Sequence, residues 1–224
     1  MLGELFNNPI SFVFWLVALM MAITIHEFSH AFAAERLGDP TPRLQGRLTL
    51  NPLAHLDPLG TLMLLLIRFG WGKPVQFDPF NLRHPRRDAA VISLAGPASN
   101  LVVALACSIA LHILFNFRLP LLSNSVIGVL VYLAIGMLQP IVVLNVMLAI
   151  FNLIPVHPLD GFKIVGGILP EEYARQWYQL EPYGLLFLLF LIFPLFGRVA
   201  PIIALISPII NFILSILLPN APLI

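Results

Sequence analysis

The sequence has few charged residues, and this scarcity excludes an ordinary soluble domain. Only 10% of its 224 residues are charged and 59% are hydrophobic, with a mean hydropathy of +0.93, whereas a soluble domain carries about 25% charged residues. The formal net charge is +1 and no block of basic residues is present, so nothing indicates a nucleic-acid partner. The composition predicts an all-α polytopic membrane protein surrounded by a lipid bilayer.

Cysteine is almost absent, and the N-terminus lacks the features of a cleaved signal. Cys107 is the single cysteine, which excludes an intrachain disulfide. No Lys or Arg precedes the first apolar run, and no small-residue cleavage pattern follows it, so this segment is expected to remain in the membrane. No internal repeat or appended soluble domain is visible, and residues 1–224 are interpreted as one integral-membrane domain.

Apolar runs predict about five full membrane spans and one short segment. The full spans are expected at residues 10–35, 88–117, 126–153, 181–197 and 199–218, lengths that suit a hydrocarbon core of about 30 Å. The apolar part of residues 57–69 is too short for an ordinary crossing and predicts a re-entrant or partial segment. In residues 41–56, alternating leucines around Gly46 suggest a small β-hairpin or an extended loop at the cytoplasmic face.

The distribution of basic residues predicts the orientation. If residues 57–69 do not cross the membrane and the first span ends in the cytoplasm, ten of the twelve Lys and Arg residues lie inside. The two outside are Arg118 and Arg198. The positive-inside rule favours this arrangement over one in which the short segment crosses, and it brings the ends of the first and third spans to the same membrane level.

The sequence His26-Glu27-Phe28-Ser29-His30 lies in the first span and predicts a zinc site. On a helix, residues four apart share a face, so His26 and His30 would present two imidazoles to one Zn²⁺. Glu27 could reach a water at the metal and act as general base. Ionisable residues inside a membrane are costly and usually functional, and three occur here within five positions.

Two histidines make a poor catalytic zinc site, so a third ligand is expected from elsewhere. Asp160 is the best candidate, because it follows a long apolar helix and stands between Pro158 and Gly161. A helix broken there could aim one side chain into a protein cavity. Asp57 and His157 remain alternatives, although Asp57, at the head of an apolar run, is also typical of a helix cap.

Three motifs in this order resemble the site-2 protease family of intramembrane zinc metalloproteases: His26-Glu27-x-x-His30, Gly96-Pro97-x-x-Asn100 and Asn152-x-x-Pro155-x-x-Pro158-Leu159-Asp160-Gly161. The resemblance covers about residues 10–165. A further stretch, Asn51-Pro52-x-x-His55-x-Asp57-Pro58-x-Gly60 followed by Lys73-Pro74-Val75, resembles the compact bacterial and archaeal branch that lacks PDZ and CBS domains. The two C-terminal spans over residues 181–218 are less characteristic.

The resemblance implies one Zn²⁺ held by His26, His30 and Asp160, with Glu27 as base, cleaving a transmembrane helix of a membrane-protein substrate in regulated intramembrane proteolysis. It also implies a prokaryotic cell membrane, with the active site towards the cytoplasm. Asn100 is a second catalytic candidate, because its amide could hold an oxyanion or the substrate backbone. An interhelical hydrogen bond is the alternative for Asn100. The competing function is a metal-ion transporter or channel that uses the same cluster.

Overall fold

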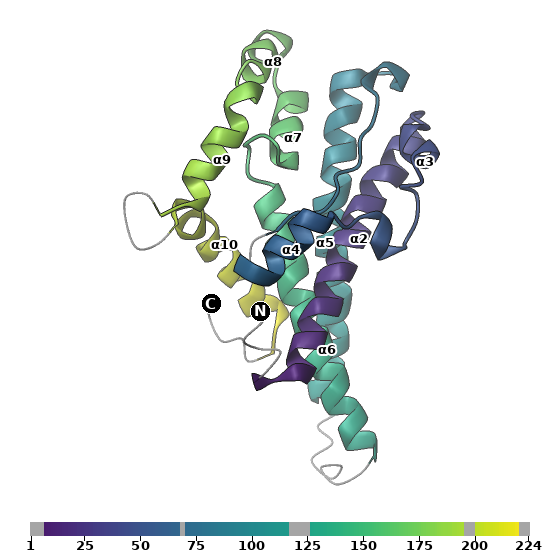
Figure 1. Ribbon diagram of the computed structural model, residues 1–224, viewed down its shortest axis with the longest axis vertical. Helices are drawn as coiled ribbons and strands as arrows, with labels where there is room; N and C mark the ends of the chain where they lie inside the picture. Colours follow the sequence, from purple (N-terminus) through teal and green to yellow (C-terminus); the bar gives the residue numbers. More distant parts are fainter. Residues whose placement is uncertain (1–6, 68–69, 117–125, 195–199, 220–224) are drawn as a thin grey trace.

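Three long apolar helices form the centre of the protein. The structure is a computed structural model that describes residues 7–67, 70–116, 126–194 and 200–219. In these residues, α2 (Pro9–Leu37), α5 (Pro85–Asn116) and α6 (Val126–Asn152) are long and apolar enough to cross a membrane. They match the predicted spans at 10–35, 88–117 and 126–153. Helix α5 packs against α2 and α6, and α2 also packs against α6 (Figure 1).

The ends of α2 follow from local sequence. The side chain of Asn8 accepts a hydrogen bond from the Ser11 N–H at 3.1 Å, which satisfies one free donor of the first turn. At the other end Gly38 adopts a left-handed conformation with φ 107°, and its N–H bonds to the carbonyls of Ala34 and Glu35. A residue without a Cβ suits this position, so the helix that carries the histidines ends at Leu37.

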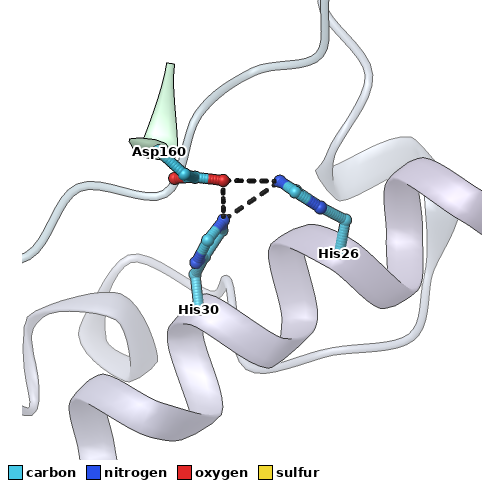
Figure 2. A group of neighbouring side chains, drawn as sticks. All are labelled: His26, His30 and Asp160. Carbon is cyan, nitrogen blue, oxygen red and sulfur yellow. Dashed lines mark hydrogen bonds and ion pairs between the residues drawn. The ribbon is translucent and has the colours of Figure 1, made fainter. Parts of the chain in front are cut away.

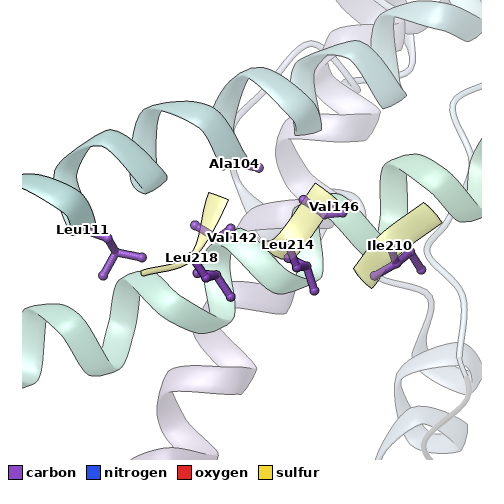
Figure 3. Packing of buried hydrophobic residues seen from close by; sticks show 7 residues of the cluster. All are labelled: Ala104, Leu111, Val142, Val146, Ile210, Leu214 and Leu218. Atoms are coloured by element: carbon purple, nitrogen blue, oxygen red, sulfur yellow. The ribbon is translucent and has the colours of Figure 1, made fainter. Parts of the chain in front are cut away.

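One of the buried apolar clusters lies away from the histidines, where α5 and α6 meet α10 (Pro201–Leu217). Figure 3 shows this cluster, whose members come from all three helices and their ends: Ala104, Leu111, Val142, Val146, Ile210, Leu214 and Leu218. Ala104 is small and the other six side chains are branched and apolar, so van der Waals contact holds these helices together. This cluster therefore fixes α6, which leads directly into the segment that carries Asp160.

The remaining helices are shorter. Helix α4 (Pro58–Ile67) has ten residues and runs obliquely to the long helices in Figure 1, and the re-entrant or partial segment stays a prediction. Helices α7 (Asp160–Ile168) and α8 (Glu171–Tyr178) follow α6. The predicted spans at 181–197 and 199–218 contain η4 (Glu181–Tyr183), α9 (Gly184–Ile192) and α10. Because residues 195–199 lie outside the described part, the count of five spans stays a prediction.

The predicted β-hairpin over residues 41–56 is wrong. This segment contains the short helix α3 (Thr41–Leu44) and the 3-10 helix η1 (Pro52–Ala54), and it has no strand. The cause lies just before the segment, because Asp39 accepts hydrogen bonds from the N–H and hydroxyl of Thr41 at 3.0 and 2.6 Å. Pro42 then continues the helical turn, for which its fixed φ is suited.

An extended loop replaces the hairpin as the covering element. Residues 71–78 connect α4 to η2 (Pro79–Asn81). Near one end, the Lys73 N–H donates to the carbonyl of His55 at 2.8 Å. At the other end, the buried carboxylate of Asp39 accepts hydrogen bonds from the Asp78 N–H at 2.7 Å and from the Asn81 amide at 2.8 Å. Both ends of the loop are therefore fixed, which determines where Val75 and Phe77 lie.

Candidate metal centre

His26 and His30 lie one turn apart on α2 and face the same point. Their Nε2 atoms are 3.1 Å apart, and their rings meet edge to face with centroids 4.6 Å apart. Both side chains are buried. This is the arrangement that the i, i+4 spacing predicts on a helix.

Asp160 meets this pair from the other side. Helix α6 ends at Asn152, and after an irregular connection Asp160 is the first residue of α7. Its Oδ2 lies 3.1 Å from His26 Nε2 and 3.2 Å from His30 Nε2 (Figure 2). The connection folds back so tightly that a Cβ at Gly161 would overlap the carbonyls of Leu153 and Ile154. Glycine after Asp160 is therefore required for the turn that aims the carboxylate.

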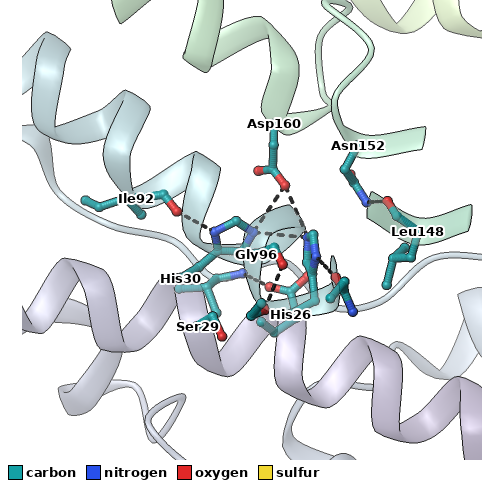
Figure 4. A network of polar contacts seen from close by, with 12 residues as sticks. His26, Ser29, His30, Ile92, Gly96, Leu148, Asn152 and Asp160 are labelled. Carbon is teal, nitrogen blue, oxygen red and sulfur yellow. Dashed lines mark hydrogen bonds and ion pairs between the residues drawn. The ribbon is translucent and has the colours of Figure 1, made fainter. Parts of the chain in front are cut away.

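The outer nitrogens of both imidazoles contact oxygens that can only accept hydrogen bonds. His26 Nδ1 donates to Asn100 Oδ1 at 2.6 Å, and His30 Nδ1 donates to the carbonyl of Ile92 at 2.7 Å (Figure 4). In a neutral imidazole, a proton on Nδ1 leaves a lone pair on Nε2. Both Nε2 lone pairs therefore point into the space beside Asp160 Oδ2, a buried oxygen without a hydrogen-bond partner in the described part of the chain.

Three acceptor atoms that converge in this way could hold a metal cation. Zinc suits the size of this triangle, because ligands at about 2.0–2.2 Å in a tetrahedron lie about 3.3–3.6 Å from one another. The observed edges are 3.1, 3.1 and 3.2 Å. Among the described residues, His26, His30 and Asp160 are the one group of His, Cys, Asp and Glu side chains that could hold a metal ion.

The two alternative third ligands lie elsewhere. Asp57 Oδ1 accepts a hydrogen bond from the Gly60 N–H at 2.7 Å, which makes it the cap of α4. His157 Nδ1 lies 3.7 Å from Glu181 Oε1. Neither residue belongs to the group around His26, so the structure brings Asp160 to the two histidines and not Asp57 or His157.

Asn100 is fully buried behind His26. Its Oδ1 faces His26 Nδ1, while its Nδ2 donates to the carbonyl of Ala22 at 3.1 Å and to Asn145 Oδ1 at 2.7 Å. Asn100 thereby joins α5 to α2 and α6. With the donors of its amide used within the protein, these contacts favour the interhelical interpretation, in which Asn100 orients His26.

Glu27 lies beside the triangle and is held by the extended loop. Its Oε2 accepts a hydrogen bond from the Val75 N–H at 2.9 Å. No donor to its Oε1 is found among the described residues, so this oxygen can take a proton. The Val75 contact could not be predicted, because a backbone N–H is present in every residue except proline.

A cavity of about 690 Å³ opens beside the centre. His26, Glu27, His30 and Asp160 line it, together with residues of α4, α6 and the loop over 71–78. Its longest wall is one apolar face of α2, formed by residues at spacings of three and four: Phe12, Leu16, Leu19, Met20 and Ile23. Apolar surface thus leads along the membrane-spanning helix to the polar centre.

Comparison with known proteins decides the family. The model of peptidase family M50 matches residues 14–192, most of the chain. The chain belongs to peptidase family M50. Family M50 contains the site-2 proteases, so the resemblance seen in the three motifs is confirmed.

Several curated relatives carry zinc metalloprotease names. "Putative zinc metalloprotease YwhC" of Bacillus subtilis is 36% identical over 189 residues, which are 84% of this chain and 84% of the relative. The Rip2 protein of Mycobacterium tuberculosis, with the same designation, is 32% identical over 186 residues, 80% of this chain and 66% of the relative. "Zinc metalloprotease MJ0392" of Methanocaldococcus jannaschii is 23% identical over 171 residues, 76% of this chain and 39% of the relative. No solved structure matches the chain.

Membership of family M50 establishes the type of reaction and the cofactor. The protein is a zinc-dependent peptidase and an integral membrane protein, with Zn²⁺ as its cofactor. The transporter alternative is therefore not supported. The large share of this chain and of the Bacillus relative that align agrees with the compact branch expected from the sequence.

Proposed function

We propose that this M50 peptidase hydrolyses a peptide bond within a transmembrane helix of a membrane-protein substrate. His26, His30 and Asp160 would hold the zinc. The observation that carries the proposal is the position of their triangle, which opens into a cavity walled by the apolar face of α2, a membrane-spanning helix. A polar, water-soluble substrate would gain little free energy from contact with this apolar wall. An apolar segment of a membrane protein would be stabilised by burying its side chains there.

Zinc bound at the triangle supplies Lewis-acid chemistry, because it lowers the pKa of a water to about 7 and polarises a carbonyl. The protein's residues supply the proton transfers. Glu27 takes a proton from the attacking water on Oε1 and later delivers it to the leaving nitrogen. The Val75 N–H holds the other oxygen of Glu27. Asn100 and the Ile92 carbonyl fix the two imidazoles as Nδ1–H tautomers.

The substrate must lose helical structure before it reacts. Peptide bonds in a helix are shielded by side chains and hydrogen-bonded internally, so a water cannot approach their carbonyl carbon. The wall of α2 from Phe12 to Ile23 extends about 17 Å at 1.5 Å per residue. A substrate could keep apolar contact along this wall while a short unwound stretch reaches Glu27.

The position of the cleaved peptide bond tests this proposal. Zinc-loaded protein in detergent would be given candidate membrane-protein segments, and products would be mapped by mass spectrometry. We expect cleavage inside the apolar stretch, and no cleavage of control peptides in which this stretch is replaced by a soluble helix. Cleavage restricted to the soluble peptides or to loops would overturn the proposal while leaving the peptidase assignment intact.

We further propose that the metal centre lies towards the cytoplasm, because ten of twelve basic residues would then be inside. Gln76 is exposed on the loop that holds Glu27. In a Cys107→Ser background, Gln76→Cys is expected to react with a membrane-impermeant thiol reagent only after the cells are opened. Labelling of intact cells would show that the metal centre lies on the opposite side of the membrane.

Gly96 permits the two rings to pack against α5. A Cβ at this position would overlap ring atoms of both His26 and His30. Gly96→Ala is therefore expected to weaken zinc binding about 10–100-fold, the range seen when an outer-shell contact is lost. Competition with a chelator measures the affinity. Leu94→Ala, an exposed position on the same turn, is the control and should bind zinc like the wild type. Wild-type affinity in Gly96→Ala would show that ring placement does not depend on this contact.

A further inference from the structure

Lys163 is a cation in the cavity that the function proposed above does not use. It lies on α7 three residues after Asp160, and side chains at this spacing share a helix face. Among the described residues that line the cavity, Lys163 is the only Lys or Arg. It thus faces the same space as Glu27 and Asp160.

The ammonium of Lys163 has no carboxylate partner. Its Nζ lies 4.6 Å from the ring centroid of Phe77 in the extended loop, and no ion pair or hydrogen bond of this nitrogen is found in the part of the chain that the structure describes. Burial lowers the pKa of Lys163, although the carboxylates of Asp160, Glu181 and Glu27 attract its charge. The ring holds the side chain in place, and the N–H donors stay available to a ligand.

Peptide hydrolysis develops a charge that such a donor can stabilise in addition to zinc. When water adds to the scissile carbonyl, the carbonyl π electrons move to oxygen, which becomes negative. Both hydrogens of Asn100 Nδ2 are used, in bonds to the Ala22 carbonyl and to Asn145 Oδ1. Asn152 Nδ2 donates one hydrogen to the Leu148 carbonyl at 3.0 Å (Figure 4) and is neutral, so it would stabilise an oxyanion less than a cation does. A fixed cation in a water-poor cavity stabilises a developing oxyanion strongly, because the dielectric there is low.

We propose that Lys163 is a catalytic residue whose ammonium donates a hydrogen bond to the oxygen of the scissile carbonyl as its charge develops. The inference rests on the proposed function. The water oxygen bonds to the carbonyl carbon while its proton passes to Glu27. The C–N bond then breaks, the oxyanion pair re-forms the carbonyl, and the proton on Glu27 goes to the leaving amine. Lys163 keeps its protons throughout and stabilises only the charged stage.

The experiment compares Lys163→Met, which keeps the apolar stem, with Lys163→Arg, which keeps the charge. A lysine that does not line the cavity, Lys73→Met, is the control. We expect Lys163→Met to lower kcat about 10²–10³-fold, the cost of removing one oxyanion donor, with KM changed less than about threefold because the ground-state carbonyl is neutral. Lys163→Arg should recover part of kcat. Zinc content should stay normal in all three variants.

A second measurement does not depend on turnover. A phosphinic peptide carries an anionic tetrahedral group in place of the scissile amide, so it resembles the charged stage. Its affinity for zinc-loaded Lys163→Met should fall about as much as kcat, while Lys73→Met should bind it like the wild type. If Lys163 only anchors the loop through Phe77, KM and thermal stability would change instead, and kcat and phosphinate affinity would stay within about threefold of the wild type; that result overturns the inference. Failure of the wild type to cut any transmembrane segment would overturn the proposed function itself.

Discussion

Glu27→Gln is expected to retain a full complement of zinc and to lose nearly all peptidase activity. The substitution keeps the size of the side chain, and an amide oxygen can still accept the Val75 N–H that now bonds to Glu27 Oε2. It removes no atom of the His26, His30 and Asp160 triangle. What is lost is the proton acceptor on the remaining oxygen. General-base catalysis contributes about 10²–10⁴ in rate, and the same group also delivers the proton to the leaving amine.

The measurement is cleavage of a membrane-protein substrate in detergent, with zinc determined on the same samples. Glu35→Gln is the matched control, because Glu35 lies on the same helix but pairs with Arg43 at 3.0 Å, away from the centre. The control should cleave at the wild-type rate. The Glu27 variant should still bind substrate and hold it uncleaved. Equal rates for Glu27→Gln and wild type would remove Glu27 from the mechanism.

Asp160→Ala is expected to lose zinc. Without the carboxylate, the two Nε2 atoms remain 3.1 Å apart, and two neutral nitrogen ligands hold zinc poorly. The loss should exceed the roughly 10–100-fold that removal of an outer-shell partner costs. Purified Asp160→Ala should therefore contain far less than one zinc per chain by elemental analysis, and peptidase activity should fall with it.

Asp57→Asn is the control for this variant, because Asp57 caps α4 through the Gly60 N–H and was the competing candidate ligand. It should keep its zinc. Full zinc retention in Asp160→Ala together with loss in Asp57→Asn would transfer the third ligand to Asp57, and retention in both would direct attention to His157.

The positions of His26 and His30 could be predicted because their relation is local. Four residues on one helix determine which face they share, and the apolar run around them predicts that helix. Asp160 was identifiable because prolines and a glycine interrupt the chain where a long helix ends. The long spans α2, α5 and α6 followed from their uninterrupted hydropathy in the same way.

The loop contacts could not be predicted, because each joins a backbone group to a side chain that is far away in the sequence. Val75 reaches Glu27 through its N–H, a donor that every residue except proline carries. The hairpin prediction failed for a related reason. Its alternating leucines favour a strand locally, but the Asp39 side chain, which precedes the segment, starts a helical turn at Thr41. In both cases the group that determines the local structure lies outside the segment whose pattern made the prediction.

The origin of the three converging atoms has a consequence for folding. His26 and His30 come from α2, whereas Asp160 comes from α7, which packs mainly on α5. Zinc held among them would act as a cross-link between parts of the chain separated by more than half its length, and metal bridges over long loops restrict the unfolded chain most. Stripping the metal would leave two lone pairs and a carboxylate facing each other at 3.1–3.2 Å, and their repulsion would push α7 away from α2. Zinc would then bind late in folding, after α2 and α7 have formed. A chain without zinc would be inactive, and α7 would pack loosely against α2 at the active site.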